Sequence, residues 1–338
     1  MKREISEAPM NGPGAARPAQ ALWYVGRGRA ELRPVVLASP GPDEALVRTL
    51  WTGLSRGTER LVFEGRVSLW ESERMRAPLQ EGDFPFPVKY GYCAVGTVEE
   101  GPDSLVGRTV FCLHPHQERF VAPVGLLRPL PDPVPARRGV LAANMETALN
   151  ALWDSGAGPG DRILVVGAGV VGCLTASLAA RLPGAEVTLV DVDLSRKEIA
   201  ARLGCGFAKP LDAPGEADVV FHASATAAGL ACALACAGPE ARVVEMSWYG
   251  DQMVPAPLGL DFHSRRLTLV SSQVGQISPS RRPRWDYERR MSKALALLAD
   301  ERLDALITEE VAFADLPGEL PRLLAPGAPG LTAAIRYA

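Results

Sequence analysis

A glycine-rich turn, Gly167-Ala-Gly169-Val-Val-Gly172, most strongly limits how this chain can fold. It follows an apolar run typical of a buried strand and opens a stretch rich in Ala and Leu that is typical of a helix. Gly167 permits a tight turn, Gly169 lets the backbone approach a pyrophosphate, and Gly172 lets the helix pack close to the strand. The pattern predicts a dinucleotide-binding turn in which the backbone around Val170 and Val171, at the helix N-terminus, meets the phosphates.

The next strand of this unit ends in an acidic residue, Asp191. A carboxylate there accepts hydrogen bonds from ribose hydroxyls and repels a 2′-phosphate, so we predict NAD rather than NADP as the cofactor. Arg196 lies nearby in the sequence and would weaken this preference. The alternative is a glycine-rich turn that binds nothing, which the strand, helix and acidic residue in register disfavour.

The N-terminal part and the middle of the chain differ in their predicted secondary structure. Residues 139–271 alternate between apolar runs and helical patterns, which indicates an α/β unit with a doubly wound parallel sheet covered on both faces. Residues 21–124 consist of short extended runs broken by Gly and Pro, which indicates an all-β domain. The predicted strands are 21–25, 31–37, 44–54, 94–99, 108–113, 119–121, 162–166, 186–190, 218–221, 242–246, 267–271 and 331–337, and the predicted helices are 170–182, 195–203, 225–237 and 287–298.

These patterns divide the chain into a leader and two domains. Residues 1–19 are rich in Pro, Gly and Ala, and we expect a disordered leader there. Residues 144–275 form the predicted Rossmann dinucleotide-binding domain. Residues 20–143 and 276–338 form the predicted catalytic domain.

Charge and cysteine usage exclude several classes of protein. The 338 residues carry 36 Lys and Arg against 39 Asp and Glu, so we predict neither a nucleic-acid partner nor an acidic membrane partner. The six cysteines form no Cys-x-x-Cys pair, which favours reduced thiols in a cytoplasmic protein. The uncharged run 163–180 approaches the length of a membrane span, but its glycines favour a strand, turn and helix of a water-soluble domain.

The chain resembles the medium-chain dehydrogenase/reductase family over about residues 20–338. In both, an all-β domain is followed by a Rossmann unit and then by a short segment that returns to the first domain. The motifs that carry the resemblance are Thr52-Gly-Leu-Ser-Arg-Gly-Thr-Glu59, Gly91-Tyr-Cys-Ala-Val-Gly-Thr-Val98, Gly107-Arg-Thr-Val110 and Gly158-Pro-Gly-Asp161. The resemblance implies a GroES-like catalytic domain, a small-molecule substrate and a homodimer formed through the edges of the Rossmann sheets.

The chain departs from the zinc alcohol dehydrogenases of this family at each ligand position. Ser55 stands where the family has a Cys ligand, and Tyr92 stands where it has a His, followed by Cys93 instead of Glu. The third position falls near Ala142 or Ala143. Catalytic zinc needs about three protein ligands, so we predict neither catalytic nor structural zinc. The chain resembles a zinc-free branch that includes the bacteriochlorophyllide a dehydrogenases.

Hydride transfer without zinc needs a protein group to move the hydroxyl proton. Tyr92 is the first candidate because it occupies a matched ligand position. It would be a more useful acid/base if a cation lowered its pKa, and Lys89 and Arg56 are possible sources of that cation. An ordinary half-buried strand aromatic is the alternative for Tyr92. Ser55, Thr58 and Glu59 complete the candidate catalytic set. Ser55 either bonds to a substrate oxygen or only replaces a lost ligand, and Glu59 either orients Tyr92, acts as base, or is a helix-capping or ion-paired group.

Several further residues have predicted roles around the cofactor and substrate. Arg56 matches a position that contacts the pyrophosphate, and Ser247 and Ser271 follow the last sheet strands, where the nicotinamide pocket lies. Glu146 either borders the nicotinamide or sits in the first turn of a helix. For His114 and His116 we favour a polar surface loop over a metal-binding pair. For Arg281, Arg282 and Arg284 we favour a solvated or ion-paired loop over a site for an anionic substrate.

Three functions remain open on the sequence. The first is a zinc-independent, NAD-dependent dehydrogenase that interconverts a secondary alcohol and a ketone. The second is a zinc-free quinone or enoyl reductase of the same family, against which Asp191 argues because such reductases commonly prefer NADPH. The third is a non-catalytic protein that binds a dinucleotide.

Overall fold

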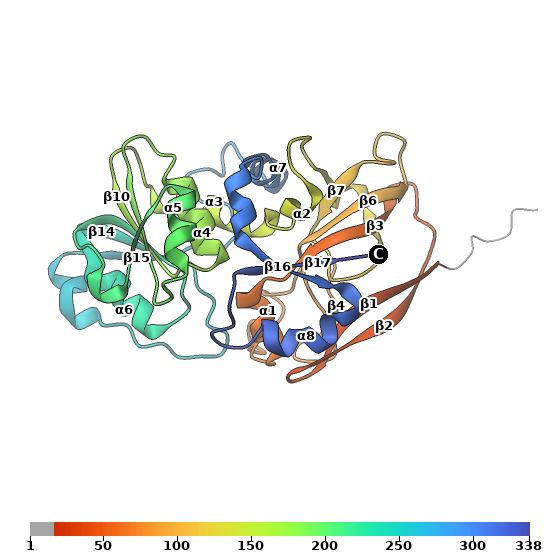
Figure 1. Ribbon diagram of the computed structural model, residues 1–338, viewed down its shortest axis with the longest axis horizontal. Helices are drawn as coiled ribbons and strands as arrows, with labels where there is room; N and C mark the ends of the chain where they lie inside the picture. Colours follow the sequence, from red (N-terminus) through yellow and green to blue (C-terminus); the bar gives the residue numbers. More distant parts are fainter. Residues whose placement is uncertain (1–16) are drawn as a thin grey trace, which may run out of the picture.

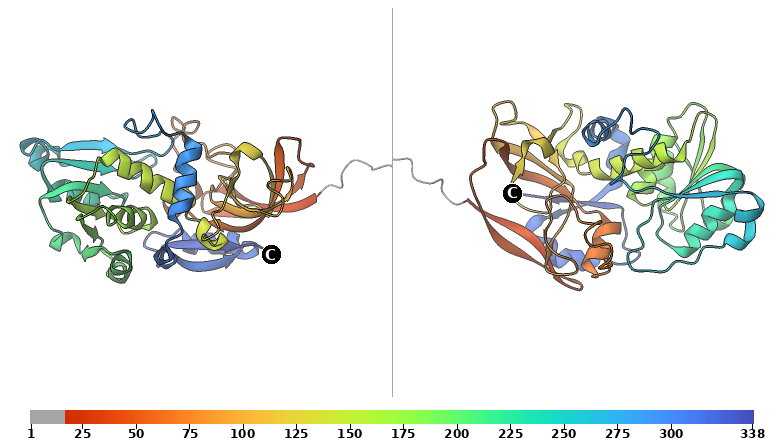
Figure 2. Two further views of the ribbon diagram at one scale, coloured as in Figure 1. Left: turned by 90° about the horizontal axis from the view of Figure 1, so that it is seen from above. Right: turned by 180° about the vertical axis from the view of Figure 1, so that it is seen from behind.

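The computed structural model describes residues 17–338, which form two lobes, one built on a parallel sheet and the other on antiparallel sheets (Figures 1 and 2). The predicted leader lies largely outside the described residues. Residues 17–19, which the prediction placed in the leader, instead belong to the first strand, β1, which begins at Arg17.

The first lobe is the α/β unit that the glycine-rich turn predicts. Its six strands are parallel and ordered β12-β11-β10-β13-β14-β15, which places the crossover between the two halves of the sheet at β10 and β13. The strands and their helices are β10 (Arg162–Val166), α4 (Val170–Ala179), β11 (Glu186–Val190), α5 (Arg196–Leu203), β12 (Gly206–Ala208), β13 (Ala217–His222), α6 (Ala227–Cys236), β14 (Ala237–Glu245) and β15 (Thr268–Ser271).

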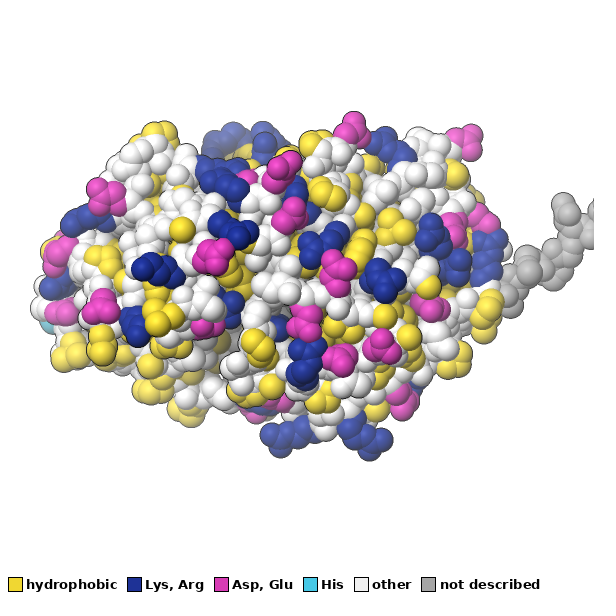
Figure 3. Space-filling view, viewed as in Figure 1, with side chains coloured by type: hydrophobic (Ala, Val, Ile, Leu, Met, Phe, Trp, Pro, Cys, Tyr) yellow, Lys and Arg dark blue, Asp and Glu magenta, His cyan; other side chains and the backbone are white. Residues whose placement is uncertain are grey.

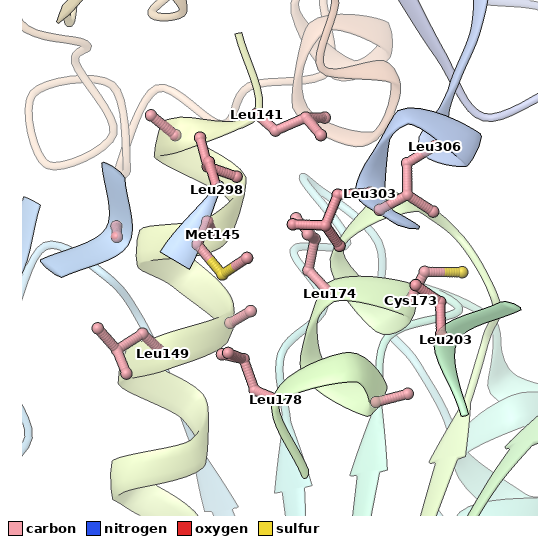
Figure 4. Packing of buried hydrophobic residues seen from close by; sticks show 14 of the residues in the cluster. Leu141, Met145, Leu149, Cys173, Leu174, Leu178, Leu203, Leu298, Leu303 and Leu306 are labelled. Carbon is pink, nitrogen blue, oxygen red and sulfur yellow. The ribbon is translucent and has the colours of Figure 1, made fainter. Parts of the chain in front are cut away.

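Alternate side chains of β10 enter two different cores, which confirms a sheet covered on both faces. Ile163 and Val165 pack in the core shared with α3 (Ala142–Ser155) and α4, whereas Leu164 and Val166 pack in the core beside α6. Figure 4 shows the first of these cores, where leucines of α3 and α4 interdigitate with Leu298, Leu303 and Leu306 from the C-terminal part of the chain. This return of the chain joins the two lobes.

The second lobe consists of two largely antiparallel sheets. The larger has the order β16-β17-β3-β6-β7-β9 with β8 paired to β3, and the smaller has the order β2-β1-β5-β4. Its strands are β1 (Arg17–Gly26), β2 (Arg29–Leu37), β3 (Glu44–Gly53), β4 (Glu81–Gly82), β5 (Val88–Lys89), β6 (Ala94–Glu100), β7 (Thr109–Cys112), β8 (Arg119–Pro123), β9 (Arg128–Pro129), β16 (Ile307–Ala312) and β17 (Thr332–Arg336). Its helices are α1 (Arg56–Phe63), α2 (Ala136–Gly139), α7 (Tyr287–Leu297) and α8 (Leu316–Leu323).

The surface carries charges of both signs. On the face shown in Figure 3, Lys and Arg side chains are interspersed with Asp and Glu side chains. Among residues 17–338, no helix combines the length and the apolar character that crossing a bilayer requires.

The loop after β7 is buried, which corrects the expectation of a polar surface loop at His114 and His116. The His114 ring stacks on Phe120 with 3.8 Å between centroids, and its Nδ1 lies 2.8 Å from the carbonyl oxygen of Pro115. Burial, reinforced by the nearby Lys89 cation, lowers the pKa of His114 from 6.5 to about 3. The folded protein therefore keeps this ring neutral where the unfolded chain protonates it.

We expect this histidine to make the fold sensitive to mild acid. Below pH 6.5 the unfolded chain binds a proton that the folded protein binds only near pH 3, so the free energy of unfolding falls as the pH drops through that window. The slope from one such group reaches roughly 1.4 kcal/mol per pH unit. His114→Phe should flatten the curve of unfolding free energy against pH, measured by urea denaturation between pH 7 and 5. Parallel curves for the two proteins would contradict the prediction.

Candidate active site

Two cavities meet between the lobes. The larger, about 580 Å³, has a mainly apolar lining that includes Phe111, Leu113 and Met291. The smaller, about 300 Å³, runs along the first turn of α4 and the loops after β13 and β14. Both are lined by Thr58, Tyr92, Thr147, Met246 and Trp248, so these five residues surround the place where a cofactor in one cavity would meet a substrate in the other.

The glycine-rich turn has the geometry that a pyrophosphate needs. Gly167 has a φ of 106°, and a Cβ on Gly172 would lie 1.9 Å from the Gly167 carbonyl oxygen, so neither position accepts a side chain. Gly169 is the N-cap of α4, and no side chain caps the helix there. Val170 and Val171 in its first turn line the smaller cavity. The turn and cavity fit a dinucleotide phosphate, because the free N–H groups of a helix N-terminus attract anions.

Asp191 follows β11 directly, as predicted. One carboxylate oxygen accepts a hydrogen bond from the Ala168 backbone N–H at 2.7 Å, and the other accepts one from the Asp193 N–H at 2.9 Å. Arg196 donates to the Gly330 carbonyl at 2.8 Å and pairs with Asp193 at 3.2 Å. The cation that would weaken an NAD preference is therefore bound to other partners than Asp191.

Arg56 lies beside the same carbonyl. Its Nη1 donates to the carbonyl oxygens of Ala328 and Gly330, at 3.1 and 3.0 Å. Its Nε and Nη2 are buried and have no hydrogen-bond partner among residues 17–338. Arg56 lines neither cavity, so its contact with the pyrophosphate stays a prediction.

Ser55 and Tyr92 form a hydrogen-bonded pair at the junction of the cavities. The Tyr92 phenol donates to the Ser55 Oγ at 2.6 Å. Ser55 occupies the N-cap of α1, so the start of this helix fixes its position, and Tyr92 lies just before β6. Thr58, in the first turn of α1, completes the polar wall.

A buried polar network stands behind this pair. Glu59 is fully buried and accepts hydrogen bonds from the Ser55 backbone N–H at 2.7 Å and from the Tyr24 hydroxyl at 2.7 Å. The His116 Nε2 lies 2.9 Å from the same carboxylate, and its Nδ1 lies 2.6 Å from the Thr52 hydroxyl. Glu59 thus holds the backbone of Ser55 and makes no hydrogen bond to Tyr92.

Neither of the two possible cations lowers the pKa of Tyr92. Lys89 bonds to Glu81 and to Gln117, and Arg56 bonds to backbone carbonyls. Burial instead raises the pKa of the Tyr92 phenol well above its ordinary value, and its hydrogen bonds with Ser55 and Thr58 only partly oppose this. At neutral pH the phenol is therefore protonated and available as a proton donor.

The site does not offer a zinc ion its usual ligands. Structural and catalytic zinc sites take about three or four Cys, His or carboxylate ligands. Within residues 17–338, no three His, Cys, Asp or Glu side chains lie close enough to one another to hold a metal ion. The matched ligand positions carry the hydroxyls of Ser55 and Tyr92, which bond to each other.

Of the other residues predicted for the site, some line the two cavities and some do not. Ser247 lines the smaller cavity, but Ser271 ends β15 and lines neither, whereas its neighbours Ser272 and Gln273 line the larger one. None of Arg281, Arg282 and Arg284 lines either of these two cavities. Arg281 lies over the Trp153 ring. Arg282 and Arg284 donate to backbone carbonyl oxygens of their own loop, so these contacts hold the loop in its shape.

Glu146 borders the larger cavity, but through a partner that the sequence pattern does not reveal. Arg290 of α7 is 2% exposed and donates to Glu146 at 3.0 Å and to the Asn150 side chain at 2.6 Å. Arg290 also donates to the carbonyl oxygens of Val274 and Gln276, which belong to the loop that walls the cavity. This arginine therefore fastens the wall of the substrate cavity to α3.

Comparison with known proteins gives partial sequence matches. No protein-family model matches the sequence. The chain is 28% identical over 215 residues to an uncharacterized zinc-type alcohol dehydrogenase-like protein of Haemophilus influenzae, which covers 60% of this chain and 58% of that protein. The geraniol dehydrogenase of Castellaniella defragrans is 32% identical over 160 residues, 42% of each chain. The chain thus matches about half the length of these relatives.

Solved structures match over nearly the whole chain. The L-idonate 5-dehydrogenase of Escherichia coli superposes with a TM-score of 0.79 at 16% identity, covering 96% of this chain and 99% of that one. A zinc-binding dehydrogenase of Sinorhizobium meliloti, bound to NADP, gives 0.76 at 19% identity over 95% and 99% of the two chains. An Escherichia coli alcohol dehydrogenase complexed with NADH gives 0.75 at 14% identity over 95% and 99%. The chain therefore has the medium-chain dehydrogenase/reductase fold and is similar in sequence to zinc-type alcohol dehydrogenase-like proteins of that family.

Proposed function

We propose that this protein is an NAD-dependent oxidoreductase that interconverts a secondary alcohol and a ketone without zinc. The observation that carries the proposal is the hydrogen-bonded pair of Tyr92 and Ser55 at the junction of the two cavities, in place of metal ligands. Similarity to alcohol dehydrogenase-like proteins supports the class of reaction. The mainly apolar lining of the larger cavity supports a substrate of low polarity.

Cofactor binding is assigned to the Rossmann lobe. The turn around Gly169 and the first residues of α4 would hold the pyrophosphate, with Arg56 as a second contact. Asp191 would hold the adenosine ribose, and Ser247 lines the smaller cavity toward the nicotinamide end. NAD, when bound, supplies the hydride acceptor or donor.

Proton transfer is assigned to the Tyr92 phenol. Its raised pKa keeps the proton on Oη at neutral pH, so Tyr92 can donate it to the oxygen of a ketone during reduction. In the oxidative direction the phenolate must accept the hydroxyl proton, and Ser55 stabilises that phenolate by turning its hydroxyl into a donor. The same phenol also suits reduction of an activated C=C bond, which remains the second candidate function.

A spectroscopic assay tests the proposed function. Protein treated with a zinc chelator and dialysed should reduce NAD+ with members of a panel of apolar secondary alcohols, followed by absorbance of the reduced nicotinamide. Metal analysis should find much less than one zinc per chain. Activity that disappears on chelation and returns with zinc would contradict the zinc-free mechanism, and turnover only with enones and NADPH would favour the second candidate.

Asp191 makes a separate prediction about cofactor choice. A 2′-phosphate next to this carboxylate meets charge repulsion, and Arg196 is held elsewhere, so NADH should bind at least about tenfold more tightly than NADPH. Asp191→Asn should narrow this gap, because the amide keeps an acceptor oxygen and loses the charge. Fluorescence titration of the two reduced cofactors measures both proteins. Equal affinities in the unaltered protein would contradict the prediction.

A further inference from the structure

The larger cavity carries more positive than negative charge. The charged residues of its lining are four arginines and two glutamates, Arg74, Arg76, Arg128, Arg290, Glu146 and Glu288. The rest of the lining is mainly apolar. A cavity with low-dielectric walls and an excess of one charge attracts ligands of the opposite sign. The lining therefore favours a ligand that combines an apolar body with an anionic group.

Three of the four arginines have protein partners that occupy their guanidinium groups. Arg290 donates from all of its nitrogens to side chains and carbonyl oxygens of the protein. Arg76 donates to Asp83 at 2.9 Å from one terminal nitrogen and to a backbone carbonyl from the other. Arg74 donates to Glu71 at 3.0 Å and is itself 77% exposed. None of these three offers a free pair of donors inside the cavity.

Arg128 is the exception. Among residues 17–338, only its Nη1 makes a hydrogen bond, to the Leu127 carbonyl oxygen at 3.0 Å. Its Nη2 lies 3.6 Å from an oxygen of Glu288, which is too long for a hydrogen bond. A carboxylate can accept two parallel hydrogen bonds from one edge of a guanidinium group. The Nε and Nη2 edge of Arg128 is available for such a bond.

The sheet places this edge at the outer end of the cavity. Arg128 of β9 pairs with Phe111 of β7, so the two side chains stand on the same face of the sheet. Phe111 is buried and lines the cavity, whereas Glu288, which faces Arg128 from α7, is 72% exposed. Arg128 lines the larger cavity and not the smaller one. The guanidinium group thus lies between the apolar lining and solvent, away from the junction of the cavities.

We propose that Arg128 determines specificity by binding the carboxylate of a hydroxy acid or keto acid whose apolar chain fills the larger cavity. The inference rests on the proposed function for the reacting group, because the secondary hydroxyl or the ketone must reach Tyr92 at the junction. The apolar lining holds the chain, and the Nε and Nη2 edge of Arg128 holds its charged end. Glu288 pairs with Arg128 in the free protein, and its exposure lets it turn into solvent when the substrate binds.

Calorimetric titration of the complete protein with octanoate and octanamide tests the anion site without any turnover. The two probes share one chain length and differ in charge, so the unaltered protein should bind octanoate about tenfold more tightly than octanamide. Arg128→Gln removes the cation and keeps a polar side chain, so it should bring the two affinities together. Glu288→Gln removes the competing carboxylate and should widen the difference.

Arg162→Gln is the matched control. Arg162 lies 3.6 Å from the exposed Asp218, the same distance as between Arg128 and Glu288, and it lines neither cavity. This change removes the same charge from the protein, so it separates a direct bond to the carboxylate from an effect of net charge. Arg162→Gln should keep the preference of the unaltered protein.

Turnover with NAD+ tests whether the anion site serves the reaction. The probes are a hydroxydecanoate with its hydroxyl on the penultimate carbon and the methyl ester of that acid. The ratio of kcat/KM for the acid to kcat/KM for the ester should fall about tenfold in Arg128→Gln, through a higher KM for the acid rather than a lower kcat.

The outcomes separate failure of this inference from failure of the proposed function. Octanoate bound no more tightly than octanamide would overturn the inference, and so would a preference that persists in R128Q or is lost equally in R162Q. If R128Q does not fold, an octanoate preference that stays unchanged in E288Q would overturn it. Oxidation of the ester but no better oxidation of the acid would also count against it. An octanoate preference without oxidation of either alcohol would overturn the proposed function and keep the anion site.

Discussion

Arg290→Met should destabilise the protein by about 3–5 kcal/mol, because it leaves the buried Glu146 carboxylate without its cation. The change also removes donors from the carbonyl oxygens of Val274 and Gln276. The methionine fills most of the volume, so the loss reflects the unpaired polar groups rather than a cavity. Thermal denaturation should show a melting temperature lower by roughly 5–15 °C at pH 7.5.

The partner of Arg290 supplies the control. The double variant Glu146→Leu, Arg290→Met removes both charges and should recover part of the lost stability, since a buried ion pair exchanged for apolar groups is often close to neutral. The single variant should also lose less stability in mild acid than at neutral pH. Burial raises the pKa of Glu146 and Arg290 opposes this, so without Arg290 the carboxyl group takes up a proton more readily. A double variant no more stable than R290M would contradict this explanation.

Strong local patterns made the Rossmann lobe predictable. The predicted strands 162–166 and 186–190 have the same bounds as β10 and β11, because apolar runs and flanking turn residues mark both ends. The acidic residue after β11 was found for the same reason. Of helix α3 only a first turn at Glu146 was anticipated and its length was missed, because the helix is buried nearly all round and shows no single amphipathic stripe.

The chemistry of the site was only partly predictable. Motif positions identified Ser55 and Tyr92, and the structure brings these two together. The contacts of Glu59 with Tyr24 and His116 join segments 35 and 57 residues apart, and no local spacing announces such pairs. The sign of the pKa shift of Tyr92 also depended on burial, which overrides the nearby cations in the sequence.

Tyr92→Phe should reduce the turnover number by at least about 100-fold, because it removes the only hydroxyl proposed to exchange a proton with the substrate oxygen. The phenyl ring keeps the packing against Tyr90, whose ring centroid lies 5.9 Å away, so the binding of NADH should change little. Steady-state rates in both directions, together with a fluorescence titration of NADH, measure the two effects separately. A loss of cofactor affinity equal to the loss of rate would indicate a structural role instead.

The pH dependence provides a second test of the same phenol. Because the pKa of Tyr92 is well above its ordinary value, its phenolate is scarce at neutral pH, and alcohol oxidation should accelerate by about tenfold per pH unit from pH 7 to 9. Ketone reduction, which uses the protonated phenol, should stay level over that range. In Tyr92→Phe the residual oxidation should lose this slope, whereas Tyr337→Phe, which removes a buried hydroxyl at the far end of the polar network, should keep it. A slope that persists in Tyr92→Phe would assign the titrating proton to another group and leave Tyr92 as part of the cavity wall.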